Sequence, residues 1–116
     1  MEKTEATEGD VCPTVQVAFE LIGKKWTGLL LKALLERDRC FAELERAVPS
    51  LSSRMLALRM RELEASGVVS RSVSPSPPVR VSYALTEKGR ALEPVLKGLE
   101  AWARKWPDLV DEAAWD

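Results

Sequence analysis

The chain has 116 residues, 46% of them hydrophobic and 30% charged, and a formal net charge of -1, which is typical of one globular domain and not of a disordered chain. It contains no histidine, which excludes imidazole-based catalysis, and two cysteines are too few for a zinc site. We therefore expect no enzymatic activity, no metal or cofactor and no membrane association, and, since the acidic N-terminus lacks a basic and apolar leader, a cytoplasmic protein.

Apolar side chains at helical spacing predict four helices in the first part of the chain. Proline and serine favour helix starts and glycine favours helix ends, so these residues set the bounds. The first helix follows Cys12 and stops near Gly23, the second starts with Thr27 as its cap, the third covers residues 41–48, and the fourth runs from the serines at 50, 52 and 53 to Gly67.

The fourth helix has two different faces when its residues are placed about 100° apart. One face is predicted to lie in the core and carries Leu56, Met60 and Leu63. The opposite face, called the outer face below, carries Ser53, Arg54, Ala57, Leu58 and Arg61. Two exposed arginines on one face gain nothing from each other, which favours an anionic ligand outside the helix, although plain solvation of both is the alternative.

Residues 68–74 and 79–85 alternate in polarity with period two and flank the sequence PSPP, which predicts a β-hairpin with a stiff loop. Arg71 and Arg80 lie on its two arms. Three helices followed by a hairpin form a winged helix-turn-helix, in which one helix enters the major groove of DNA and the hairpin lies against the backbone. The predicted fold class is therefore α+β, mainly α.

A last long helix is predicted from near Thr86 to just before Pro107. Its apolar stripe is longer than the small core needs, so we expect it to pack on the first helix of a second copy in a two-fold dimer. The alternative is that the stripe covers its own domain. The predicted dimer residues are Val15, Phe19, Leu92, Leu96, Leu99, Trp102 and Trp106.

The charges are distributed unevenly along the chain. Residues 1–10 and 108–116 are acidic segments, and the predicted domain between them, residues 11–107, holds 16 basic and 10 acidic side chains. Such a basic body is compatible with a polyanion partner, because binding depends on the local field. A mixed, solvated surface is the alternative.

Four motifs together are more specific than any one of them: CP at Cys12, ELIGKKWTGLLLKALL from Glu20, RCFAELERAVPSLSSRMLALRMRELEASGVV from Arg39, and SYALTEKGRALEPVL from Ser82. The chain resembles the HxlR-type winged helix-turn-helix transcriptional regulators, relatives of the MarR-like repressors. This resemblance implies a homodimer that binds an inverted-repeat operator in double-stranded DNA and responds to an oxidant, electrophile or small-molecule effector. The alternative function is a protein-interaction module without specific DNA binding.

The resemblance also assigns roles to residues. It places the whole outer face of the fourth helix in the DNA groove, where Leu58 departs from the usual polar residue and would contact thymine methyl groups. In the hairpin, Arg80 is the candidate for a phosphate or the minor groove. Lys24 and Lys25 would hold a phosphate at the start of the second helix, although plain solvation is an equal alternative for either.

Cys12 matches the cysteine that precedes proline in the family. At the start of a helix, the free amides and the helix dipole favour the thiolate, which predicts redox sensing; the alternative is an ordinary thiol, and Asp10 opposes ionisation. Cys40 is expected to pack, with a disulfide to Cys12 of the partner subunit as a second option that loop geometry decides.

Overall fold

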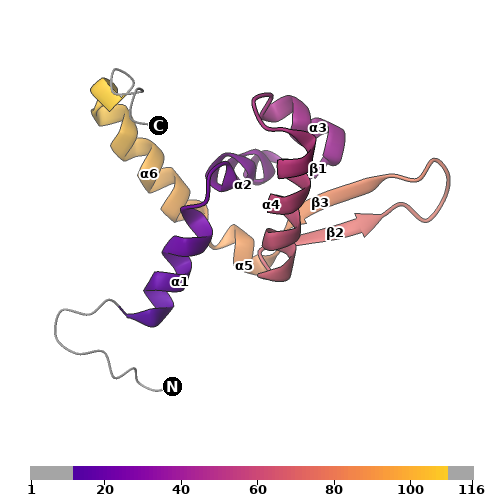
Figure 1. The fold of residues 1–116 in the computed structure, drawn as a ribbon, viewed down its shortest axis with the longest axis horizontal. Helices are drawn as coiled ribbons and strands as arrows, with labels where there is room; N and C mark the ends of the chain where they lie inside the picture. Colours follow the sequence, from indigo (N-terminus) through magenta and orange to yellow (C-terminus); the bar gives the residue numbers. More distant parts are fainter. Residues whose placement is uncertain (1–11, 110–116) are drawn as a thin grey trace.

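The computed structural model of the chain describes residues 12–109 (Figure 1). The acidic ends that the sequence analysis separated from the domain, including Asp10, lie outside these residues except for Asp108 and Leu109. In chain order the elements are α1 (Pro13–Ile22), α2 (Thr27–Glu36), β1 (Arg39–Cys40), α3 (Phe41–Ala47), α4 (Ser53–Ala65), β2 (Val69–Val73), β3 (Val81–Leu85), α5 (Glu87–Arg90) and α6 (Glu93–Lys105). The predicted winged helix-turn-helix is confirmed.

Local sequence signals explain the bounds of α4. Its N-cap is Ser52, whose hydroxyl accepts a hydrogen bond from the backbone N–H of Met55 at 3.1 Å, as expected for a serine in this position. The helix ends at Ala65 with Ser66 as its C-cap, and Gly67 then adopts a φ of +81°, which glycine tolerates best. The second helix differs from the prediction, because Trp26 is its N-cap and Thr27 is already helical and buried.

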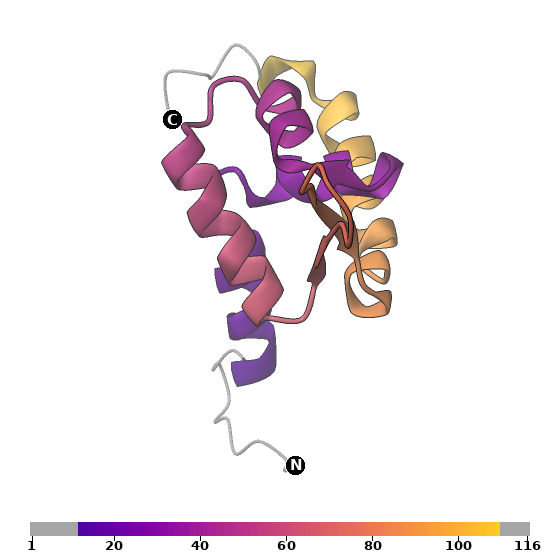
Figure 2. The ribbon, with the colours of Figure 1, turned by 90° about the vertical axis from the view of Figure 1, so that its right-hand side faces the viewer.

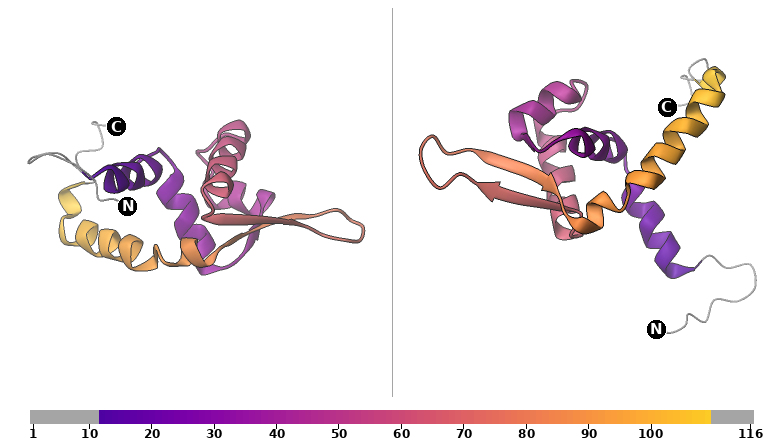
Figure 3. Two further views of the ribbon diagram at one scale, coloured as in Figure 1. Left: turned by 90° about the horizontal axis from the view of Figure 1, so that it is seen from below. Right: turned by 180° about the vertical axis from the view of Figure 1, so that it is seen from behind.

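The three strands form an antiparallel sheet in the order β1-β3-β2. In the hairpin, Val69 pairs with Leu85, Arg71 with Tyr83 and Val73 with Val81, so these pairs share one face of the sheet. On this face Val69 and Leu85, at the end of the hairpin far from its loop, are buried. The side chains nearer the loop are more exposed. The far end of the hairpin therefore projects from the helices as a wing (Figures 1 and 3).

The core lies between α2, α3, α4 and the sheet. The predicted inner stripe of α4 is confirmed, because Leu56, Met60 and Leu63 are at most 1% exposed. Figure 2, which views the domain from the side of the hairpin, shows α4 standing at the edge of the domain beside that hairpin. One face of α4 is thus held by the core, and the opposite face is left to solvent. The largest fully buried side chains on the other helices are Leu30, Leu31, Leu34 and Leu44.

The prediction of one long last helix is wrong in one respect, because this segment forms two helices. The α5 helix ends at Arg90, and α6 begins at Glu93. Pro94 lies in the first turn of α6; in one continuous helix it could not donate a backbone hydrogen bond, and its ring would clash with the carbonyl of Arg90. The break allows α6 to leave the domain in a new direction.

The helices α1 and α6 extend on the side of the domain away from the wing (Figures 1 and 3). Neither helix contains a buried residue. The assignment of the apolar stripe to a second copy needs a correction, because Leu92 and Leu96 are half-buried against the core of their own domain. Among residues 12–109, no helix is long and apolar enough to cross a bilayer.

Candidate nucleic-acid interface

The outer face of α4 points away from the core, as predicted. Arg54 and Arg61 are exposed, Leu58 is 37% exposed and Ala57 is half-buried. The hydroxyl of Ser53 donates a hydrogen bond to the carboxylate of Glu45 on α3, so this position of the outer face is already occupied by a contact within the fold. The remaining side chains present two cations with small and apolar groups between them.

The arginines of α4 divide into two kinds. Arg59 is only 13% exposed and its guanidinium lies 3.2 Å from the carboxylate of Glu62. Arg54 and Arg61 form no ion pair within residues 12–109. Their charge is therefore available to an external anion, whereas that of Arg59 is neutralised within the fold.

A pocket of about 360 Å³ lies between α4 and the hairpin, lined by Ala57, Arg61, Glu64, Arg71 and Tyr83. Arg71 is placed there by the strand register, which sets it directly beside Tyr83. No ion pair within the described chain neutralises Arg71 or Arg61. Arginines from two elements thus line one concave site together with the carboxylate of Glu64, and guanidinium groups favour an oxyanion there whereas the carboxylate opposes one.

Arg71 lines this pocket beside Arg61 but was not among the residues that the sequence predicts for the site. The alternation of the hairpin placed it on a strand but did not show which side of the strand faces α4. The strand register would have revealed its position. Tyr83 is one of the few aromatic residues, and the residue paired directly with it, Arg71, lies on the same face of the sheet. In a hairpin the register depends on the loop geometry, and the length of the proline-rich loop was not enough to fix it.

The predicted lysine pair differs in its two members. The Nζ atom of Lys24 lies 3.0 Å from a carboxylate oxygen of Glu62 on α4, so this lysine is engaged inside the fold. The Nζ atom of Lys25 lies 5.1 Å from the ring centre of Trp26 and the side chain is exposed. Arg80 is exposed in the wing loop just before β3. All three side chains are exposed, but only Lys25 and Arg80 have no ion-pair partner among residues 12–109.

Cys12 is the N-cap residue of α1 and is half-buried. Its thiol closes no capping hydrogen bond, but the backbone N–H groups of Val15 and Thr14 lie close enough to lower the pKa of the thiol, while partial burial opposes them. A lowered pKa increases the thiolate fraction at neutral pH, which is the reactive form. Sensing chemistry at Cys12 is thus compatible with its position.

Cys40 has a structural part in the fold. It is the N-cap of α3, and its backbone N–H donates to a carboxylate oxygen of Glu43 at 2.9 Å while its side chain accepts from the N–H of Glu43. This reciprocal arrangement is a capping box with cysteine in place of serine or threonine. Cys40 is a free thiol in the chain. The structural role expected for it is therefore to cap α3.

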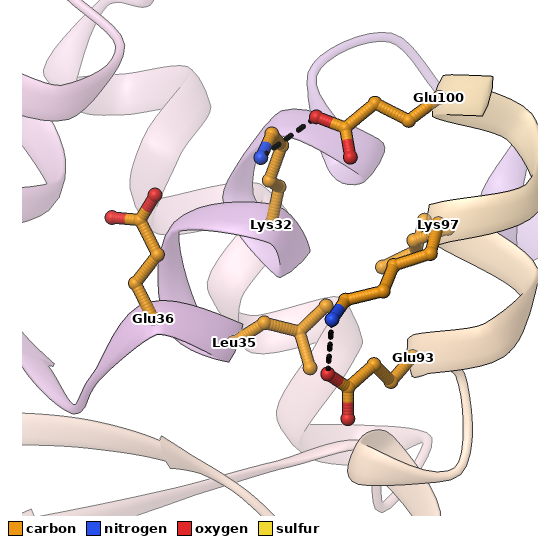
Figure 4. Close-up of a pocket in the computed structure, with 7 residues that line it drawn as sticks. Lys32, Leu35, Glu36, Glu93, Lys97 and Glu100 are labelled. Carbon is orange, nitrogen blue, oxygen red and sulfur yellow. Dashed lines mark ion pairs between the residues drawn. The ribbon is translucent and has the colours of Figure 1, made fainter.

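Most of the large apolar side chains of α1 and α6 are exposed. Between α2 and α6, a groove of about 300 Å³ is lined by Trp26, Gly28, Leu29, Lys32, Leu96, Leu99, Glu100 and Ala103. Next to it, Figure 4 shows Lys32 on α2 reaching Glu100 on α6, at 2.9 Å, and Lys97 reaching Glu93 along α6, at 3.1 Å. Because these charges pair with each other, the groove presents mainly its apolar lining to a partner. The exposed apolar residues on the two helices and at the C-cap of α6 include Val15, Val17, Phe19, Val95, Leu99, Trp102 and Trp106.

Comparison with known proteins gives a consistent assignment. The model of the HxlR-like helix-turn-helix family matches residues 21–111. The HTH-type transcriptional regulator YvaP of Bacillus subtilis is 43% identical over 101 residues, which cover 87% of this chain and 94% of YvaP. YodB of the same organism, also an HTH-type transcriptional regulator, is 44% identical over 101 residues, covering 87% of this chain and 90% of YodB.

Two solved structures are similar as well. Reduced YodB superimposes with a TM-score of 0.76 and 42% identity, over 84% of this chain and 95% of that chain. The redox regulator HypR in its reduced form gives a TM-score of 0.79 and 38% identity, over 85% of this chain and 98% of that chain. The chain therefore belongs to the HxlR-like helix-turn-helix family and is a DNA-binding transcriptional regulator.

Proposed function

We propose that the protein binds an inverted-repeat operator as a homodimer, with the outer face of α4 in the major groove and the hairpin against the backbone of each half-site. The observation that carries this proposal is the separation of two surfaces. Arginines without a carboxylate partner in the described chain gather on α4 and the hairpin, whereas uncovered apolar side chains gather on α1 and α6.

Each part of the interface has its own role in this proposal. Arg54 and Arg61 bind guanine edges or phosphates, and Leu58 packs against thymine methyl groups. The pocket between α4 and the hairpin holds a backbone phosphate between Arg61 and Arg71. Arg80 contacts a phosphate or the minor groove beyond it. These backbone contacts position the protein, while the base contacts of α4 provide sequence preference.

The dimer contact follows from the unburied apolar surface. The exposed fractions are 71% for Phe19, 56% for Leu99, and 53% for both Trp102 and Trp106, which a protein seldom leaves open over adjoining helices. The radius of gyration of 16.6 Å also exceeds the value of about 13 Å for a compact domain of this size. Burial against a second copy covers this surface and sets the two α4 helices about 34 Å apart, one turn of DNA.

Cys12 is proposed as the sensing residue of the same dimer. Its thiolate adds to an electrophile such as a quinone, or is oxidised by a thiol oxidant. Related proteins have been studied under such conditions: YodB has been solved after diamide treatment and with bound quinone, and HypR in its oxidized form. Because Cys12 begins α1, a group attached there lies at the proposed dimer contact.

The test is a fluorescence-anisotropy titration of the full chain on the DNA upstream of its own gene, at two salt concentrations, with and without diamide. We expect tight binding that weakens with salt because counterions are released. Arg54→Ala and Arg61→Ala should each weaken binding without changing the dimer mass in sedimentation. Arg90→Ala is the matched control, since Arg90 is an exposed arginine on α5, outside α4 and the hairpin.

Each part of the proposal has its own contrary outcome. Absence of binding at low salt contradicts the operator and favours the protein-interaction module. Wild-type affinity in both arginine variants contradicts the placement of α4 in the groove. Binding that diamide leaves unchanged, or that still responds in Cys12→Ser, removes Cys12 as the sensor and leaves the regulator intact.

A further inference from the structure

A cluster of charged groups joins α4 to the turn that follows α1. Arg59 donates from Nε to the backbone carbonyl oxygen of Lys25 at 2.9 Å and from Nη1 to Oε1 of Glu62 at 3.2 Å. Lys24 donates from Nζ to Oε2 of Glu62 at 3.0 Å. We call the side chains of Lys24, Arg59 and Glu62 the turn clamp. They link residues more than 30 positions apart in the sequence, and the DNA interface proposed above uses none of them.

The clamped turn has a tightly defined backbone. Gly23 closes α1, and a Cβ atom at this position would lie 2.7 Å from the carbonyl oxygen of Phe19, so a larger residue requires a shift. Trp26 adopts a φ of 82°, which is uncommon for a residue other than glycine. The N–H of Thr27 donates back to the carbonyl of Lys24 at 3.2 Å. The turn is therefore short and specific, and α4 holds it through the carbonyl of Lys25.

The direction of α1 depends on this turn. No residue of α1 is buried, and of its side chains Leu21 and Ile22, both at its end, pack against the core. Within residues 12–109, the rest of the helix is exposed and extends away from the domain (Figure 1). A helix of ten residues is about 15 Å long, so a tilt of about 15° at the turn moves its far end by about 4 Å.

We propose that the turn clamp fixes the angle between α1 and α4 and thereby sets the half-site spacing that the dimer accepts. This inference rests on the proposed function, in which α1 contacts the second copy and α4 contacts DNA. A displacement of about 4 Å is close to the rise of one base pair, about 3.4 Å, so the angle at the turn decides the spacing to within a base pair. Arg59, Glu62 and Lys24 are then positioning residues that touch neither DNA nor the second copy.

The chemistry of the clamp suits this task. Hydrogen bonds and charge from Lys24 and Arg59 lower the pKa of Glu62, while partial burial opposes them, so the carboxylate is ionised at neutral pH. The guanidinium of Arg59 contacts a carbonyl and a carboxylate at once, which its planar fork allows and a lysine ammonium does not reproduce. Its side chain is 13% exposed, and this shielding makes the contact less sensitive to salt than a surface pair.

The experiment compares operators that differ only in spacing. Half-sites are placed at the natural separation and with one base pair inserted or deleted at the centre, and binding is measured for the wild type, Arg59→Gln and Glu62→Gln. The wild type should lose at least about tenfold in affinity on either change, because its two α4 helices cannot engage both half-sites at once. In both variants we expect the loss to shrink to about threefold or less.

The controls separate positioning from stability. Glu87→Gln alters an exposed glutamate on α5, outside the clamp, α4 and the hairpin, and should keep the wild-type spacing profile. Affinity for a single half-site, the dimer dissociation constant and the urea unfolding midpoint are measured in parallel and should change little in the clamp variants. Arg59→Lys, which keeps the charge but not the fork, should give an intermediate profile.

Contrary results are distinct for the two proposals. A wild-type spacing profile in both clamp variants overturns the inference, and so does an equal loss of binding to single half-sites together with a lower unfolding midpoint, because the clamp would then serve stability alone. A wild type that does not bind as a dimer, or that binds all spacings equally, contradicts the proposed function itself.

Discussion

Replacement of Arg71 by glutamine tests the pocket between α4 and the hairpin without disturbing the core. Arg71 is exposed on β2 and has no ion-pair partner among residues 12–109, so its removal leaves no buried charge unpaired. We therefore expect the free energy of unfolding to change by no more than about 0.5 kcal/mol. An effect on DNA binding then reports on the interface alone.

The expected magnitude comes from counterion release. Each phosphate contact contributes about 0.9 to the slope of log affinity against log salt concentration, so the loss of Arg71 from both halves of a dimer should lower the slope by about 1.8. Between about 50 and 200 mM salt, the ratio of wild-type to variant affinity should then fall by about 12-fold. A phosphate contact carries no base identity, so the change should be the same for different operators.

The measurement is fluorescence anisotropy over a series of salt concentrations for the wild type, Arg71→Gln and the control Arg90→Gln, whose slope should equal that of the wild type. An unchanged slope in Arg71→Gln refutes the phosphate in this pocket. A lower affinity at an unchanged slope also refutes it, because Arg71 would then contact a base or support the fold.

Three further outcomes follow from single residues. Met60→Ala deletes a side chain that is 1% exposed and should lower the free energy of unfolding in urea by about 2–5 kcal/mol; a loss below about 1 kcal/mol contradicts the packing of α4 described above. The backbone N–H of Cys40, followed by Arg37, lowers the pKa of Glu43 to about 2 from 4.5, so its stabilisation is complete above pH 4.5 and is lost as the pH falls toward 2. In Glu43→Gln, stability followed by circular dichroism should depend less on pH between about 4.5 and 2. An unchanged pH dependence would exclude Glu43 as its source. The lowered pKa of Cys12 predicts alkylation by iodoacetamide at lower pH than free cysteine, measured by mass spectrometry, and an equal pH profile would contradict it.

The features of α4 that depend on neighbouring residues were predictable from the sequence. Its serine cap, its terminal glycine and its buried stripe are all properties of residues within four positions of each other. The order of helices and hairpin was predictable in the same way. The break before α6 also had a local signal in Pro94, but the long apolar stripe concealed it, because Leu92 and Leu96 keep the helical spacing while packing inward.

The contacts of individual charged residues were not predictable, because they depend on partners far along the chain. Lys24 and Lys25 are adjacent and alike in sequence, yet only Lys24 meets Glu62, which lies 38 residues away. The sequence therefore assigned both lysines to a phosphate, whereas in the structure only Lys25 of the two has no ion-pair partner among residues 12–109. The same limit applies to Arg71, whose position beside α4 follows from the strand register.

The division of the arginines explains why a chain with a net charge of -1 carries a surface suited to DNA. Within residues 12–109, four arginines form ion pairs with carboxylates of the same chain, namely Arg37, Arg39, Arg59 and Arg104. Of the six arginines without an ion pair there, four lie on α4 or the hairpin: Arg54, Arg61, Arg71 and Arg80. Because the interaction with DNA depends on the local field within about 10 Å and not on the total charge, acidic residues elsewhere in the chain oppose it only weakly. Charges used for folding and charges left for binding can thus alternate along one helix, as Arg59 and Arg61 do on α4.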